Sequence, residues 1–99
     1  MKESRHYAFL PETTLQADEF KALTTHAKLL LFYMTCRRYG RDEWFTYPYK
    51  DIRNDTGYRP ETIAKCIRQL STKGFLEYEH GGLEANSNRY KLNMAWMEI

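Results

Sequence analysis

Residues 49–79 read YKDIRNDTGYRPETIAKCIRQLSTKGFLEYE, and this stretch decides the fold. Gly57 is suited to end a first helix, because glycine adopts a positive φ at little cost. Pro60 is suited to the first position of a second helix, and Gly74 to its end. Between them, apolar residues recur at the spacing of one buried helix face: Ile63, Cys66, Ile67 and Leu70. The pattern predicts helices over residues 49–56 and 60–73.

The connection between these two helices is very short, since only Gly57, Tyr58 and Arg59 separate them. Such a link favours a steep crossing over antiparallel packing, which is the arrangement of a helix-turn-helix. The N-terminal half of the second helix would then project outward, and a helix is narrow enough to enter the major groove of DNA. Residues 75–79 and 88–92 read as two strands, so a β-hairpin is predicted directly after this helix.

Upstream, the clearest helix begins at Thr24, a good N-cap residue, and is predicted to stop near Gly40. Its apolar residues cover more than one face, so we expect it to be central: Ala27, Leu29, Leu30, Leu31, Phe32, Met34 and Cys36. Residues 43–47 are rich in β-forming side chains and predict a short strand that Pro48 ends.

The two ends of the chain are predicted to pack against this core. Residues 1–23 are expected to form a packed arm with a helical turn at Pro11 and Glu12, and residues 93–99 a tail that packs through Trp96 and Met97. A chain of 99 residues is expected to form a single domain. The expected fold class is α+β, mainly α, with three main helices and a small antiparallel β-sheet.

The order of these features resembles the winged helix-turn-helix domains of phage and plasmid replication proteins and transcriptional regulators. The residues that carry the resemblance are AKLLL at 27–31, Tyr47-Pro48-Tyr49, Gly57, Thr62-Ile63, LSTKGFL at 70–76 and NRYKL at 88–92. The resemblance implies a winged helix with residues 75–92 as the wing. It also implies binding of double-stranded DNA in replication initiation or transcriptional regulation, with helix 60–73 in the major groove.

Charge is unevenly distributed along the chain. The formal net charge is only +2, but residues 50–73 hold six cations and three anions, a local excess of three positive charges. Affinity for DNA depends on local phosphate contacts, so this excess matters more than the total. Double-stranded DNA is therefore the expected partner, and a homodimer or a larger replication or transcription complex are both left open.

The predicted DNA-binding residues lie mostly on the helix at 60–73, opposite its buried face. Arg59, Thr62 and Lys65 are nearest its leading end and are expected to contact the groove and its phosphates. Glu61 and Arg68 lie on the same face. The alternative for all five is an ordinary solvated helix face.

Two further pairs complete the predicted interface. Lys50 and Arg53, on the preceding helix, are expected to hold phosphate beside the groove. Asn88 and Arg89, on the hairpin, are candidates for contact with the backbone or the minor groove. The acidic residues around the hairpin turn would repel phosphate, so a purely structural hairpin is the alternative. The turn region holds Glu77, Glu79, His80, Glu84 and Asn86.

Other classes of function find little support in the sequence. No Gly-rich phosphate loop, nucleophile elbow or paired metal ligands are present, so we expect no enzyme, no metal site and no cofactor. Cys36 and Cys66 are expected to pack in the core. The polar N-terminus and the short apolar runs predict neither signal peptide nor membrane span, hence a cytoplasmic protein that is nucleoid-associated when bound to DNA. The alternative function is a winged-helix protein-interaction module without DNA binding, suggested by three aromatic residues expected to be exposed: Tyr39, Tyr47 and Trp96.

Overall fold

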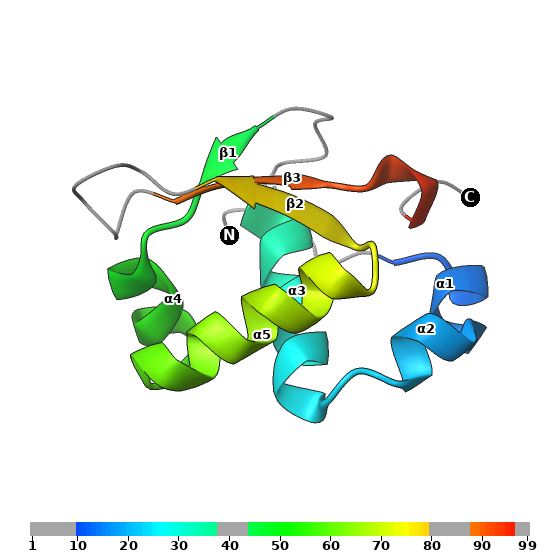
Figure 1. Ribbon diagram of the computed structural model, residues 1–99, viewed down its shortest axis with the longest axis horizontal. Helices are drawn as coiled ribbons and strands as arrows, with labels where there is room; N and C mark the ends of the chain where they lie inside the picture. The colour runs from blue at the N-terminus through cyan, green and yellow to red at the C-terminus, as the bar shows by residue number, and fades with distance from the viewer. Residues whose placement is uncertain (1–9, 38–43, 80–87, 97–99) are drawn as a thin grey trace, which may run out of the picture.

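Figure 1 shows the computed structural model, which describes residues 10–37, 44–79 and 88–96. Within these ranges the elements are α1 Glu12–Gln16, α2 Asp18–Lys21, α3 Thr25–Arg37, β1 Phe45–Thr46, α4 Tyr49–Thr56, α5 Pro60–Thr72, β2 Leu76–Glu79, β3 Arg89–Leu92 and the 3₁₀ helix η2 Met94–Trp96. The sheet lies above α3 and α5, with α4 at one end of the molecule and α1 and α2 at the other (Figure 1). The described part of the chain is thus mainly helical with one antiparallel sheet, which confirms the coarse fold class predicted from the sequence.

Helix α5 has the start and stop signals that the sequence predicts. Pro60 occupies its first turn, and Gly74 follows its end with a φ of 85°. The N–H of Phe75 donates to the carbonyl of Leu70 at 2.9 Å, and the N–H of Gly74 donates to that of Ser71 at 3.1 Å. These two bonds satisfy two of the carbonyl groups in the last turn of the helix. The predicted apolar face is buried as expected: Ile63, Cys66, Ile67 and Leu70.

Helix α3 lies at the centre of the core, as predicted. The hydroxyl of Thr24 accepts a hydrogen bond from the N–H of Ala27 at 3.2 Å, which caps the helix. Four of its side chains have no exposed surface: Ala27, Leu30, Leu31 and Met34. The stop predicted at Gly40 lies outside the described residues.

Helix α4 has the predicted bounds, Tyr49–Thr56, and a compact turn joins it to α5. Gly57 has a φ of 77°, and its N–H donates to a carbonyl of the last turn of α4 at 2.7 Å. The hydroxyl of Thr56 donates to the carbonyl of Ile52 at 2.7 Å and accepts a bond from the N–H of Tyr58 at 3.1 Å. Figure 1 shows α5 leaving this turn at an angle to α4.

The three strands form an antiparallel sheet in the order β1-β3-β2. Tyr90 on β3 lies opposite Phe45 on β1 and Tyr78 on β2, while Leu92 lies opposite Leu76. Leu76, Tyr90 and Leu92 are buried, so this face of the sheet belongs to the core. The alternate positions form two cross-strand pairs of opposite charge, Glu77 with Lys91 and Glu79 with Arg89.

The described residues of the arm and the tail pack together against one end of α5. The ring of Phe75 lies 6.3 Å from that of Phe20 and 4.7 Å from that of Trp96. The indole N–H of Trp96 donates to the carbonyl of Gly74 at 3.1 Å, and the hydroxyl of Thr14 donates to the carbonyl of Trp96. The predicted packing of both segments is confirmed over residues 10–23 and 93–96. The arm contains two short helices, where the sequence predicted one helical turn.

Two buried tyrosines make the stability of this fold sensitive to alkaline pH. Burial raises the pKa of Tyr47, and so does the carboxylate of Asp55, to which its hydroxyl donates a hydrogen bond. Burial also raises the pKa of Tyr90, while the neighbouring Asn88 side chain lowers it, and the Tyr90 hydroxyl makes no hydrogen bond of good geometry among the described residues. In the unfolded chain a tyrosine releases its proton near pH 10, whereas the folded protein retains it. The contribution of these two tyrosines to the free energy of unfolding is therefore fully present below about pH 10 and is lost as the pH rises above it.

We expect Tyr90→Phe to remove the contribution of this residue to the alkaline decline. Above about pH 10, the free energy of unfolding of the unmodified protein should fall more steeply than that of the variant, by up to about 1.4 kcal/mol per pH unit. At pH 8 the variant should be at least as stable, because it buries no unpaired hydroxyl. Urea unfolding at a series of pH values measures both slopes. Equal slopes in the two proteins would contradict the burial of this hydroxyl.

Candidate nucleic-acid interface

Helix α4 separates its charged residues onto two sides. Lys50, Arg53 and Asn54 are exposed and share one side, because their spacing is i, i+3, i+4. Asp51 and Asp55 share another side at the spacing i, i+4, and both form hydrogen bonds there. The sequence predicted Lys50 and Arg53 as phosphate contacts but missed Asn54. The same helical spacing is the signal that could have found it.

The two carboxylates of α4 are held by Arg37 of α3 and by Tyr47, which packs against Arg37. The guanidinium of Arg37 donates to Asp51 at 2.7 Å and lies 4.7 Å from the centre of the Tyr47 ring. Tyr47 in turn donates its hydroxyl to Asp55. These contacts draw the negative charge of α4 toward α3. The opposite side of α4 keeps only its cations.

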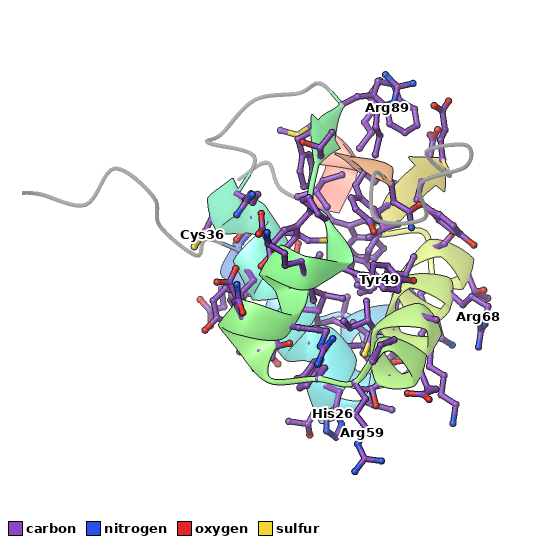
Figure 2. All side chains as sticks on the ribbon, turned by 90° about the vertical axis from the view of Figure 1, so that its left-hand side faces the viewer. His26, Cys36, Tyr49, Arg59, Arg68 and Arg89 are labelled. Atoms are coloured by element: carbon purple, nitrogen blue, oxygen red, sulfur yellow. The ribbon has the colours of Figure 1, made fainter. Side chains whose placement is uncertain are left out.

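The leading end of α5 carries the candidate residues predicted from the sequence. Arg59, Glu61, Lys65 and Arg68 are exposed, and Thr62 is half-buried. Figure 2 shows Arg59 and Arg68 projecting away from the body of the molecule. Within the described parts of the chain, no ion pair or side-chain hydrogen bond is made by the cations of α4, of α5 and of the two residues that flank α5: Lys50, Arg53, Arg59, Lys65, Arg68 and Lys73.

A hollow of about 680 Å³ opens between α4 and the turn that precedes α5, and we call it the α4 hollow. Its lining consists of Tyr49, Lys50, Arg53, Asn54, Gly57, Tyr58, Arg59 and Pro60. All three charged residues in this lining are cations. The fold therefore brings Arg59 beside Lys50 and Arg53, and the α4 hollow suits an anionic ligand.

Tyr49 lies where α4, α5 and β2 approach one another, and Figure 2 shows it between α4 and α5. Burial raises the pKa of Tyr49, and the neighbouring Tyr78 raises it further, while Arg68 lowers it. Arg68, at the far end of the cationic side of α5, is therefore within range of an electrostatic interaction with Tyr49. No signal in the sequence predicted this interaction, because it depends on how α4 and α5 cross.

The hairpin contributes less to this surface than the sequence predicted. Asn88 is only 2% exposed, so its side chain cannot reach DNA, and its prediction as a contact is wrong. The signal was present, because Asn88, Tyr90 and Leu92 alternate onto the buried face of β3. The predicted tip residues His80, Glu84 and Asn86 lie outside the described residues.

Arg89 is exposed but engaged within the hairpin region. Its guanidinium forms an ion pair with Glu79 and lies 5.4 Å from the centre of the Trp44 ring. Glu77 lies opposite Lys91 in the same pair of strands. The described part of the hairpin therefore balances its acidic residues with its own cations, and Arg89 has less freedom to contact a ligand than Arg59.

Two of the three aromatic residues expected to be exposed, Tyr47 and Trp96, are buried or half-buried in the structure. Tyr47 has no exposed surface, which corrects that prediction. Trp96 is half-buried against Phe75, and Tyr39 lies outside the described residues. Leu29, at 41%, is the exposed large apolar residue within the described ranges. The exposed aromatic surface that suggested a protein-interaction module is therefore absent at Tyr47 and smaller than expected at Trp96.

The described residues contain neither a metal-binding cluster nor a membrane-spanning helix. Cys66 is buried and Cys36 half-buried, and burial raises the pKa of both thiols. Residues 10–37, 44–79 and 88–96 contain no group of three or more His, Cys, Asp or Glu side chains that could hold a metal ion. None of the helices in these ranges has both the length and the apolar character needed to cross a membrane. No protein-family model, curated protein or solved structure matches this chain.

Proposed function

We propose that this protein is a winged helix-turn-helix domain that binds double-stranded DNA, with α5 in the major groove. The order of α4, a three-residue turn, α5 and the antiparallel strands β2 and β3 supports this assignment. Replication initiation or transcriptional regulation is the proposed role, because the sequence resembles domains with these roles.

The observation that carries the proposal is the separation of charge on α4 and α5. Asp51 and Asp55 are hydrogen-bonded on the α3 side of α4, whereas the cations of α4 and α5 remain exposed and without ion pairs among the described residues. Glu61 is the one acidic residue between Lys50 and Lys73 without a hydrogen bond among the described residues. A cationic surface next to a projecting helix end fits the phosphates that border a major groove.

The residues divide into two roles on this surface. Arg59, Thr62 and Lys65 lie at the leading end of α5, where side chains can reach base edges or the nearest phosphates. Glu61 would accept a hydrogen bond from a cytosine amino group in that groove. Lys50 and Arg53 would hold a phosphate in the α4 hollow and so fix the position of α5 on the duplex.

Selection of bound sequences from a pool of random DNA duplexes tests the proposal. We expect enrichment of a defined site, and binding that weakens steeply with salt. If Lys50, Arg53, Arg59, Lys65 and Arg68 each neutralise one phosphate, log K against log salt should have a slope of about −4.5. Affinity would then fall roughly 500-fold between 50 and 200 mM salt.

A double-stranded RNA of the selected sequence provides the control. Its deep, narrow major groove does not admit side chains to the base edges, so its binding should be weaker and independent of sequence. Absence of enrichment, together with no salt-sensitive binding to DNA at low ionic strength, would refute the proposed function. A protein-interaction role would then be the remaining candidate.

A further inference from the structure

A second hollow, of about 270 Å³, lies between the start of α3 and the outward side of α5, and we call it the α3 hollow. Its lining consists of Thr24, His26, Thr62, Lys65, Cys66 and Gln69. It shares no lining residue with the α4 hollow. Two hollows therefore border the leading half of α5. Residues of α3 contribute to the lining of one, and residues of α4 and of the turn before α5 form the lining of the other.

The acceptor groups around the α3 hollow are already used inside the protein. The side-chain oxygen of Gln69 accepts a hydrogen bond from the backbone N–H of Thr24 at 2.8 Å. The hydroxyl of Thr24 accepts one from Ala27 at 3.2 Å, and the carbonyl of His26 accepts one from Tyr58 at 3.1 Å. Because the N–H of Thr24 can only donate, the orientation of the Gln69 amide is fixed.

The groups left over in this lining are mainly donors. The amino group of the Gln69 amide, the ammonium group of Lys65 and the hydroxyl of Thr62 have no partner among the described residues. The exposed imidazole of His26 adds a further donor. No carboxylate lines the hollow. A group with several negatively charged oxygen atoms is the ligand that such a set of donors fits.

The two hollows are held in a fixed relation by Tyr58. Tyr58 lines the α4 hollow, while its ring lies 4.9 Å from that of His26 and its hydroxyl bonds to the His26 carbonyl. Figure 2 shows His26 and Arg59 at the same end of the molecule. The turn before α5 is therefore tied to the start of α3.

We propose that the α3 hollow binds a backbone phosphate of the DNA strand opposite to the strand held at the α4 hollow. The inference rests on the proposed DNA-binding function and deepens it. A major groove is about 12 Å wide, and a helix with its side chains is about 10–12 Å across. A helix seated in the groove is thus bordered by both phosphate backbones, and α5 has a donor-lined hollow for each of them.

The substitution Gln69→Glu tests this assignment closely. It keeps an oxygen to accept the N–H of Thr24, but it replaces the free amide donor with a negative charge in the α3 hollow. We expect binding of the selected duplex to weaken about tenfold or more. Gln16→Glu makes the same chemical change at an exposed position of α1, at the other end of the molecule from α4, and should leave binding unchanged (Figure 1).

The contacted phosphate can be located by replacing each phosphate of the duplex in turn with an uncharged methylphosphonate. In the unmodified protein, replacements on both strands should weaken binding. In Gln69→Glu, methylphosphonate at one position on one strand should no longer weaken binding. Thr62→Val is a milder second variant and should have the same effect. Lys50→Ala should remove a penalty on the other strand. The effects of a side-chain substitution and of a phosphate replacement stop being additive only where the two groups are in contact, so the lost penalty identifies the phosphate that Lys50 contacts.

Each outcome of these experiments decides a different point. If no duplex is bound at all, the proposed function fails and this inference fails with it. If Lys50→Ala removes a phosphate penalty but Gln69→Glu behaves like Gln16→Glu, only the role of the α3 hollow is refuted. If millimolar inorganic phosphate binds at the α3 hollow while the duplex penalties stay unchanged in Gln69→Glu, the hollow is a free-anion site and the inference is also overturned.

Discussion

Truncation of Ile67 to alanine is expected to lower the free energy of unfolding by roughly 2–5 kcal/mol. Ile67 is 2% exposed and lies in the middle of the buried face of α5, within the apolar cluster that joins α5 to α3 and the sheet. Removing its outer carbon atoms leaves a cavity that the surrounding side chains fill only in part. Because small domains are stable by only about 5–15 kcal/mol, this loss is a large share of the total.

Urea unfolding monitored by circular dichroism measures this effect. Ile67→Val removes a single methyl group and should cost only about 0.5–1.5 kcal/mol. Thr72→Ala, at an exposed position of the same helix, should change stability by no more than about 0.5 kcal/mol. If Ile67→Ala were as stable as Thr72→Ala, the buried face of α5 would be wrongly assigned.

The helices that carry the site could be predicted from the sequence because their signals are local. Pro60 and Gly74 bound α5, and Gly57 ends α4, so the backbone itself marks where each helix starts or stops. The apolar spacing of α5 then fixes which side is buried. The exposure of Lys65 and Arg68 follows directly from the same spacing.

Contacts between distant segments could not be predicted in this way. Tyr47 was expected to be exposed, yet its side chain is enclosed by Arg37 of α3 and by Asp55 of α4. Nothing near Tyr47 in the sequence specifies these partners. The same holds for the bond between Thr24 and Gln69, which are 45 residues apart and together shape the α3 hollow.

Only part of the candidate site could therefore be predicted from the sequence. The cations of α4 and α5 were identified, since charge and helical spacing are visible in the sequence. The role of Asp51 and Asp55 was not, because sequence spacing alone places them on a helix surface without saying which neighbour they bind. Their hydrogen bonds toward α3 turn a weakly basic stretch into a surface that carries mainly positive charge.

The double substitution Arg59→Ala, Lys65→Ala is expected to weaken binding of the selected DNA duplex by roughly a hundredfold or more. Each residue is exposed at the leading end of α5 without an ion pair among the described residues. Loss of a base contact costs about 1–3 kcal/mol, whereas loss of a phosphate contact weakens binding to all sequences and reduces the salt slope by about one unit. The two effects should be nearly additive, since the structure shows no contact between the two side chains.

The control for this experiment is Lys21→Ala, which removes one positive charge from an exposed position of α2, far from α4 in Figure 1. It should leave both the affinity and the salt slope unchanged, because long-range attraction is screened within about 10 Å at 0.1 M salt. Thermal unfolding of the double variant should match that of the unmodified protein, since neither side chain is buried. Loss of binding without loss of stability would separate this variant from Ile67→Ala, which acts through the fold. If both single variants bind DNA as tightly as the unmodified protein, α5 is not the helix that reads the duplex.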